Sequence, residues 1–428
     1  VLAGVIARQA VERGLAKRAG LLATQGIRGG ANRRVLERIK QTGDIFWAQS
    51  DRNWTLDGAT VHVSMVGFDN SDEKNRELDG RPVAQINADL TAQSDVTQAA
   101  RLPENANLSF MGVTPAGPFD VPTDLASKWL SSAHQDKSPN NDVLRPYFNA
   151  ADITQTPRSV WIIDFTNKTL EEASRYQEPF EWIRTKVQPV RSQNRRASYR
   201  DRWWQFAEAR SGMRLALAPL HRYILTPRVS KHRLFIWLDA RVLPDSATIA
   251  IARSDDYFFG VLHSRYHELW ARRAGTQLRE AESGCRYTPT TTFETYPFPW
   301  PPGQEPGEGD GQVAPIARAA RELDALRRRW QAPEGVGVVI SAAQARRRTL
   351  TALYNALGQY RADFKGQRRN PRQWGEACGN LIALDEIEEL DQLHRELDEA
   401  VADAYGWPHA LADDDILARL LALNRERG

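Results

Sequence analysis

Residues that could form a catalytic or metal site are few and scattered in this sequence. Two central histidines, His263 and His267, are four residues apart and could share one helix face. No third ligand accompanies them, as zinc would require. The chain has no G-x-S-x-G, Walker-lysine or H-E-x-x-H pattern. We interpret His221, His232, His263 and His267 as hydrogen-bonded structural residues or as residues that face a ligand.

Two other patterns favour structural explanations over chemical ones. Gly26, Gly29 and Gly30 could bring backbone amides close to a phosphate, but their spacing is not G-x-G-x-x-G, which favours a tight turn into a helix. Cys285 and Cys378 are far apart and lack metal-ligand spacing, so they indicate reduced thiols. No metal is implied.

Positive charge is concentrated between residues 182 and 233. This segment has 13 Lys/Arg and two acids, a balance of +11 in a chain whose net charge is +3. Aromatic residues such as Trp203 and Trp204 are interleaved with the basic ones. Basic side chains release counterions from phosphates and aromatic faces stack on bases, so the segment suits a nucleic acid.

Within this segment, the turn at 226–233 is the most specific candidate for contact with a nucleic acid. Arg228, Lys231, His232 and Arg233 surround Pro227 and repel one another unless an anion neutralises them. We expect phosphate or base contacts from them. For Trp203 two interpretations stay open, which are packing at a domain edge and contact with a base or sugar.

The elements expected around these residues indicate an α/β protein with a helical tail. The first 20 residues have helical spacing, and a strand–loop–helix–strand–strand order follows up to residue 68. A strand at 159–165, a helix at 170–183 and a strand at 234–238 frame the basic segment. Helices are expected at 313–330 and 341–359, and the final 44 residues carry 13 acids against four Arg around an apolar stripe. No apolar run reaches 18 residues, so we expect a cytoplasmic protein without a membrane helix.

Three longer motifs carry a family resemblance: LTPRVSKH at 225–232, DYFFGVLHS at 256–264 and YTPTTTFETYPFP at 287–299. They resemble the target-recognition region of large bacterial adenine-specific DNA methyltransferases, similar to type II-L restriction–modification and phage-defence enzymes. Residues 21–30 and 61–68 resemble the segment after the catalytic motif and the last strands of the methyltransferase sheet. The resemblance implies a class I, S-adenosylmethionine-dependent enzyme that flips its target adenine out of double-stranded DNA.

The chain departs from this family in one important respect. The Asn-Pro-Pro-aromatic motif that holds the adenine amino group is absent, and the one Pro-Pro pair, Pro301-Pro302, lies in a linker-like stretch. The cofactor-binding glycine strand is absent as well. The chain also does not begin with Met. We therefore expect the C-terminal portion of such an enzyme, inactive alone, with other defence-system subunits as further conceivable partners. The alternative is a stand-alone, non-catalytic DNA-binding specificity protein.

The expected organisation has four parts. Residues 1–75 would end a Rossmann-like methyltransferase sheet, 76–302 would form a mixed α/β target-recognition domain, 303–312 a linker, and 313–428 the helical tail. Charge pattern and resemblance together give these candidate DNA-binding residues: Arg195, Arg196, Arg200, Arg202, Trp203, Arg228, Ser230, Lys231, His232, Arg233, Tyr287, Thr288 and Thr290.

Overall fold

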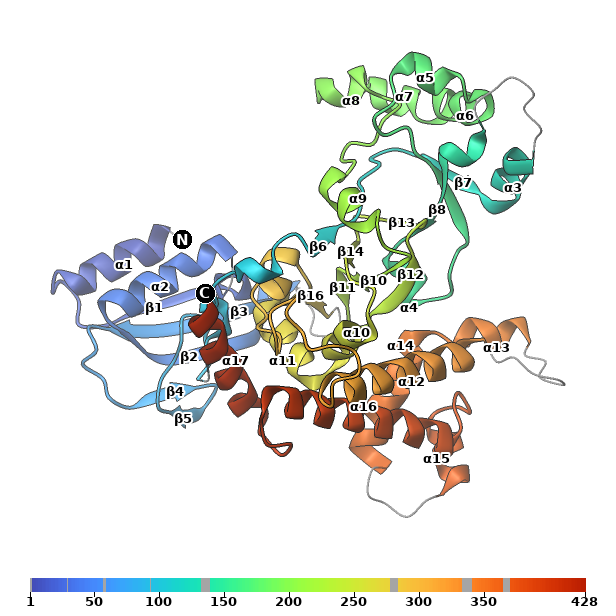
Figure 1. Ribbon diagram of the computed structural model, residues 1–428. Helices are drawn as coiled ribbons and strands as arrows, with labels where there is room; N and C mark the ends of the chain where they lie inside the picture. The colour runs from blue at the N-terminus through green and yellow to red at the C-terminus, as the bar shows by residue number, and fades with distance from the viewer. Residues whose placement is uncertain are drawn as a thin grey trace.

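The computed structural model describes residues 2–28, 30–56, 59–92, 94–131, 139–277, 284–332, 341–364 and 370–428. Figure 1 shows an N-terminal sheet with two helices, a second lobe built on short strands, and a row of C-terminal helices that runs beneath the second lobe and rises toward the N-terminal sheet. The mixed α/β fold with a helical C-terminal part confirms the expected fold class. Among the described residues, no helix is both long and apolar enough to cross a membrane.

The N-terminal sheet has the strand order β1-β3-β2-β4-β5. Its elements are α1 (Leu2–Glu12), β1 (Ala19–Thr24), α2 (Arg34–Thr42), β2 (Asp44–Leu56), β3 (Ala59–Asp69), β4 (Arg76–Leu78) and β5 (Arg81–Val83). β3 lies between β1 and β2 and is antiparallel to both, whereas β2 and β4 are parallel. The helix expected to reach Gly20 ends at Glu12, before Gly14 with its positive φ of 72°.

The second lobe contains three small sheets, ordered β12-β10-β14-β6, β13-β8-β9-β7 and β11-β16-β15. Its strands are β6 (Ser109–Met111), β7 (Asp120–Pro122), β8 (Leu144–Phe148), β9 (Val160–Ile163), β10 (Arg222–Pro227), β11 (Val229–Ser230), β12 (Ile236–Asp239), β13 (Leu243–Pro244), β14 (Thr248–Ile251), β15 (Thr276–Gln277) and β16 (Cys285–Arg286). Its helices are α3 (Thr123–Ser131), α4 (Ala150–Thr154), α5 (Leu170–Ser174), α6 (Gln177–Lys186), α7 (Gln188–Ser192), α8 (Ala197–Asp201), α9 (Ser211–Leu217), α10 (Asp256–His263) and α11 (Arg265–Ala274).

The C-terminal helices are α12 (Val313–Gln331), α13 (Ala342–Arg347), α14 (Leu350–Gln359), α15 (Pro371–Ala377), α16 (Leu384–Tyr405) and α17 (Asp413–Arg427). Two single helices predicted from the sequence are each broken in two. Pro179 lies in the first turn of α6 and cannot donate a backbone bond to the preceding helix, so α5 and α6 are separate. Thr349 accepts a hydrogen bond from the Ala352 amide and begins α14 after α13.

Two hydrophobic cores divide these elements. One lies beneath the N-terminal sheet and includes residues up to Leu90. The other runs from Val96 to Leu421 and joins the second lobe to the C-terminal helices. The α17 side chain Asn424, fully buried, donates to the Ala100 and Thr295 carbonyls and accepts from the Ala100 amide. The C-terminal helices therefore pack as part of the second lobe, while the four-part domain division stays a prediction.

Candidate nucleic-acid interface

The first group of candidate side chains lies on and around α8, at the far end of the second lobe in Figure 1. Arg195, Arg196, Arg200 and Arg202 are all exposed. Arg196 donates to the Tyr199 hydroxyl at 3.1 Å, and Arg200 donates to the carbonyls of Asn194 and Arg195. Within the described ranges no acidic side chain pairs with any of these four arginines. Their charge is therefore available to an external anion.

A buried arginine holds this group in place. Arg191 is 1% exposed and donates to the Pro115 carbonyl at 2.5 Å and the Gln205 carbonyl at 3.2 Å. Its guanidinium lies 4.7 Å from the centre of the Tyr199 ring, whose other partner is Arg196. Burial lowers the pKa of Arg191, although an arginine keeps its charge at neutral pH. The charge pattern alone did not distinguish Arg191 from its exposed neighbours.

Trp203 belongs to the core of the second lobe. Its side chain is 8% exposed, and its ring packs against Phe180 and Trp204 with centroid separations of 5.8 and 6.1 Å. Of the two interpretations that the sequence left open, these contacts favour packing over contact with a base or sugar. The buried ring has little exposed surface on which a base could stack.

The second group lies where β10 ends and the turn into β11 begins. The Arg228 amide donates to the Ala247 carbonyl, and the Arg228 carbonyl accepts from the Tyr287 amide, both at 2.8 Å. The backbone is thus fixed on both sides. The Arg228 side chain is half-buried and Lys231 is exposed. Neither side chain has a hydrogen bond or ion pair in the part of the chain that the structure describes.

Three neighbours of these two residues bond to the protein itself, and whether they also contact DNA stays a prediction. Arg233 donates to Thr226 Oγ1 at 3.0 Å, to the Pro227 carbonyl at 2.5 Å and to the Cys285 carbonyl at 2.9 Å. Burial lowers the pKa of Arg233 to about 10. Ser230 Oγ donates to the His232 carbonyl, and the His232 ring bonds to Asn355 of α14. These side chains hold the turn rather than extend from it.

Tyr287 is also internal. It is 1% exposed, its ring faces the Arg233 guanidinium at 4.9 Å, and its hydroxyl bonds to His267 Nε2 at 3.0 Å. The turn and β16 come so close at Gly284 that a Cβ there would lie 1.9 Å from the Ser230 carbonyl oxygen, and its φ of +81° favours glycine. Burial raises the pKa of Tyr287, so the phenol stays neutral.

The remaining candidates begin the turn of Pro289–Phe293. Thr288 accepts from the Thr291 amide at 3.1 Å and caps this turn, and Thr290 is half-buried. His263 and His267 are buried and have no metal-ligating neighbours, since no group of three His, Cys, Asp or Glu in the described ranges could hold a metal ion. The candidate contact residues thus form two groups: the arginines near α8, and the turn with Arg228, Lys231, Thr288 and Thr290.

One family model matches the segment that contains both groups. Residues 124–300 match the family model described as the target recognition domain of MmeI. Both groups of candidates lie inside that range. The resemblance drawn from the sequence is thereby confirmed for the target-recognition segment.

Among solved structures, this chain resembles the type IIL restriction–modification enzyme MmeI, determined in complex with DNA. The two share 19% identity with a TM-score of 0.70, and the match covers 100% of this chain and 52% of the MmeI chain. The chain therefore has the fold of about half of MmeI. The type IIG restriction endonuclease BpuSI aligns over 91% of this chain and 47% of its own, at 10% identity and a TM-score of 0.26. No curated protein sequence matches the chain.

Proposed function

We propose that this chain is the sequence-specific DNA-recognition portion of a larger site-specific DNA adenine N6-methyltransferase of a restriction–modification or phage-defence system. The observation that carries this proposal is the target-recognition family match over 124–300 inside a fold that follows MmeI along the whole chain. The N-terminal sheet would complete the catalytic domain of that enzyme. It would act in the bacterial cytoplasm, where its substrate DNA lies.

The two groups of side chains suit two kinds of DNA contact. Arg195, Arg196, Arg200 and Arg202 are exposed, without acidic partners and next to one another, which suits phosphates, the contacts that position a protein on DNA. Arg228 extends from a backbone held on both sides, which suits recognition of a base edge. Lys231 follows in the same turn, and Thr288 and Thr290 follow Tyr287, whose amide bonds to the Arg228 carbonyl. Binding would therefore combine a salt-sensitive grip with a rigid reading turn.

The chain's own residues do not fit a complete methyl-transfer site. S-adenosylmethionine would supply the methyl group in the full-length enzyme, but no Asn-Pro-Pro-aromatic motif or glycine strand for the cofactor occurs in this sequence. The contribution of this chain would be to hold the duplex while the target adenine leaves the stack, which costs a few kcal/mol. Recognition energy from the second lobe would offset that cost.

The test is selection of duplexes from a randomised library by the purified chain, followed by affinity measurements on the selected sequence and on scrambled DNA. We expect one enriched sequence with a clear affinity advantage over scrambled duplex. Equal affinity for all duplexes would overturn the proposal. The coding sequence upstream of Val1 distinguishes the enzyme from a stand-alone binding protein, because the enzyme requires an Asn-Pro-Pro-aromatic motif there.

A further inference from the structure

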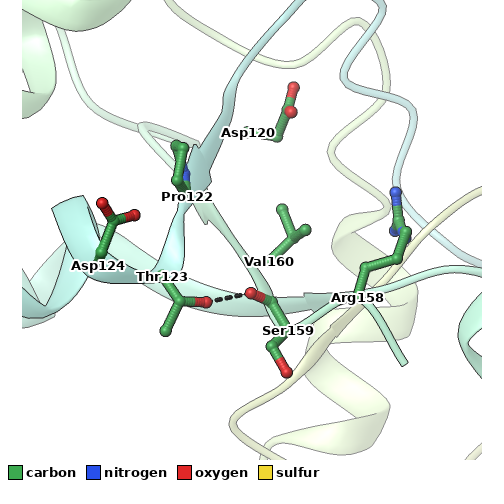
Figure 2. Close-up of a pocket in the computed structure, with 7 residues that line it drawn as sticks. All are labelled: Asp120, Pro122, Thr123, Asp124, Arg158, Ser159 and Val160. Carbon is green, nitrogen blue, oxygen red and sulfur yellow. Dashed lines mark hydrogen bonds between the residues drawn. The ribbon is translucent and has the colours of Figure 1, made fainter. Parts of the chain in front are cut away.

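A hollow on the second lobe borders segments that are hydrogen-bonded to the surroundings of both groups of candidate DNA-contacting residues. Its two adjoining parts have volumes of about 380 and 320 Å³, and both are lined by Asp120 and Arg158. Figure 2 shows these two side chains extending to the same side of the strands, from β7 and from the segment before β9. Nothing in the sequence pattern links two residues so far apart.

The walls of the hollow continue into both candidate groups. On one side the Pro115 carbonyl, part of the lining, accepts the hydrogen bond of Arg191, which supports the exposed arginines near α8. On the other side the lining residues Asp245 and Ser246 lead to Ala247, whose carbonyl accepts the Arg228 amide. The hollow therefore adjoins both of the surfaces that we propose to contact DNA.

Arg158 is held in a fixed orientation at the rim. Its amide and Nε donate to Asp152 Oδ1 at 2.8 and 3.0 Å, and its Nη2 donates to Asp152 Oδ2 at 2.9 Å. These bonds raise the pKa of Arg158, while the side chain remains 43% exposed. Because Asp152 takes the Nε–Nη2 edge of the guanidinium, Nη1 of this lining residue has no internal partner among the described residues.

Asp120 is the opposite case, an exposed carboxylate without a hydrogen bond or ion pair among the described residues. A carboxylate close to DNA repels phosphates unless it accepts a hydrogen bond from a base. In the major groove, cytosine N4 and adenine N6 are the amino donors, and adenine places an acceptor, N7, beside its amino group. Cytosine therefore suits Asp120 better. Guanine, the partner of cytosine, presents two acceptors that suit Arg158.

We propose that Asp120 and Arg158 together read one C·G base pair of the recognised site, with Asp120 accepting from cytosine N4 and Arg158 donating to guanine. This inference rests on the proposed function, since it names specificity residues within the same DNA-binding surface. It adds a base-reading site that lies outside the basic segment.

The decisive variant is Asp120→Asn, which preserves shape and breaks no internal hydrogen bond. On the sequence selected by the wild-type chain, we expect discrimination at one C·G position to fall about tenfold or more, with preference moving toward adenine because an amide can pair with adenine N6 and N7. Arg158→Lys should relax the same position. The matched controls are Asp124→Asn, an exposed acid on the same rim, and Arg175→Lys, an exposed arginine that follows α5; both should leave that position unchanged.

The outcomes separate this inference from the proposed function. If the wild-type chain selects a sequence and Asp120→Asn selects it with an unchanged profile, the base-reading site is wrong and the proposed function stands. The same holds if the two variants alter different base pairs, or if Asp124→Asn has the effect of Asp120→Asn. If the wild-type chain selects no sequence, both proposals fall. Thermal melting of each variant checks the fold, and Asp120→Asn carries the test should Arg158→Lys melt early.

Discussion

At the scale of single residues, basic side chains of similar sequence context have opposite roles. Arg228 and Arg233 flank the same turn, yet Arg228 has no internal partner among the described residues and Arg233 bonds to three acceptors. In the same way, Arg191 is buried and bonds to two carbonyls, whereas Arg195 is exposed. Sequence spacing in an irregular turn does not determine which side chain folds inward, because that depends on carbonyls supplied by distant segments such as that of Cys285.

We predict that Arg228→Lys weakens binding to the selected sequence by about 1–3 kcal/mol and changes binding to scrambled DNA little, because lysine lacks the planar fork that pairs with a guanine edge. Fluorescence anisotropy on both duplexes measures this difference. Arg195→Lys is the matched control and should change both affinities equally and slightly. An equal weakening on both duplexes would make Arg228 a phosphate-binding residue instead.

For Arg233 the expected signature is different. Arg233→Met should lower the free energy of unfolding by about 1–3 kcal/mol, because it leaves the Pro227 and Cys285 carbonyls without their donor. DNA affinity should fall with it, since the turn that carries Arg228 is loosened. Thermal melting and anisotropy on one preparation measure both effects. Unchanged melting together with weaker DNA binding would instead support a direct DNA contact by Arg233.

At the scale of elements, strands and helices with strong periodicity were predictable from the sequence, as β3, α2 and α12 show. The helices α5 and α6 were predicted as one because the break depends on Pro179 within a continuous apolar pattern. The packing of α17 against the segment around Ala100 was not predictable, since Asn424 lies 324 residues away from it. The hollow at Asp120 and Arg158 was missed for the same reason.

The four exposed arginines near α8 should dominate the salt dependence of binding. Replacing Arg195, Arg196, Arg200 and Arg202 by Gln should reduce the log–log salt slope by roughly 0.9 for each phosphate that is no longer neutralised. Because α17 is part of the core, the control is not truncation of the acidic tail but replacement of its exposed acids Asp385, Glu399 and Asp415 by amides. A larger change from that control than from the arginine set would contradict the assignment.

Buried histidines between the second lobe and the C-terminal helices predict an acid-sensitive core. Burial lowers the pKa of His267 and of His394 to about 3 from an ordinary 6.5. Below pH 6.5 the unfolded chain then binds more protons than the folded chain. The contribution of these histidines to stability is therefore fully present above pH 6.5 and is lost between pH 6.5 and 3. The shifted pKa of each histidine should make the free energy of unfolding about 2 kcal/mol lower at pH 5 than at neutral pH. Burial raises the pKa of Asp398 to about 7, which acts in the opposite direction and offsets part of this decrease.

Urea unfolding at pH 7 and pH 5 measures this dependence. We expect the wild-type chain to be less stable at pH 5, and His394→Asn to be destabilised less by acidification than the wild type, whatever its stability at pH 7. Asp398→Asn should be destabilised more than the wild type, because its compensating protonation is removed. Parallel curves for all three proteins would show that these groups are solvated and that the packing around α16 is looser than the structure shows.

At the scale of the whole molecule, the two cores separate a sheet from a recognition lobe that includes the C-terminal helices. Arg327 of α12 donates to His263 Nε2 at 2.7 Å and to the Phe235 carbonyl at 2.8 Å, which fastens the helices to α10 and the start of β12. Tyr405 and Arg427 bond to carbonyls at 297–299. The C-terminal helices are therefore a structural support of the lobe that we propose to read DNA.

This arrangement predicts a chain that binds its DNA sequence yet transfers no methyl group alone. The residues that we propose to recognise DNA and the helices that support them are present, whereas the motif that holds the adenine amino group in the enzymes that the chain resembles is absent from the sequence. Incubation with radiolabelled S-adenosylmethionine and the selected duplex should give no incorporation above a DNA-free control, while anisotropy on the same preparation shows binding. Incorporation would mean that the chain contains an active site of another kind. Joining an upstream segment with the Asn-Pro-Pro-aromatic motif should restore transfer to the same duplex and not to scrambled DNA, since we propose that the specificity resides in this chain.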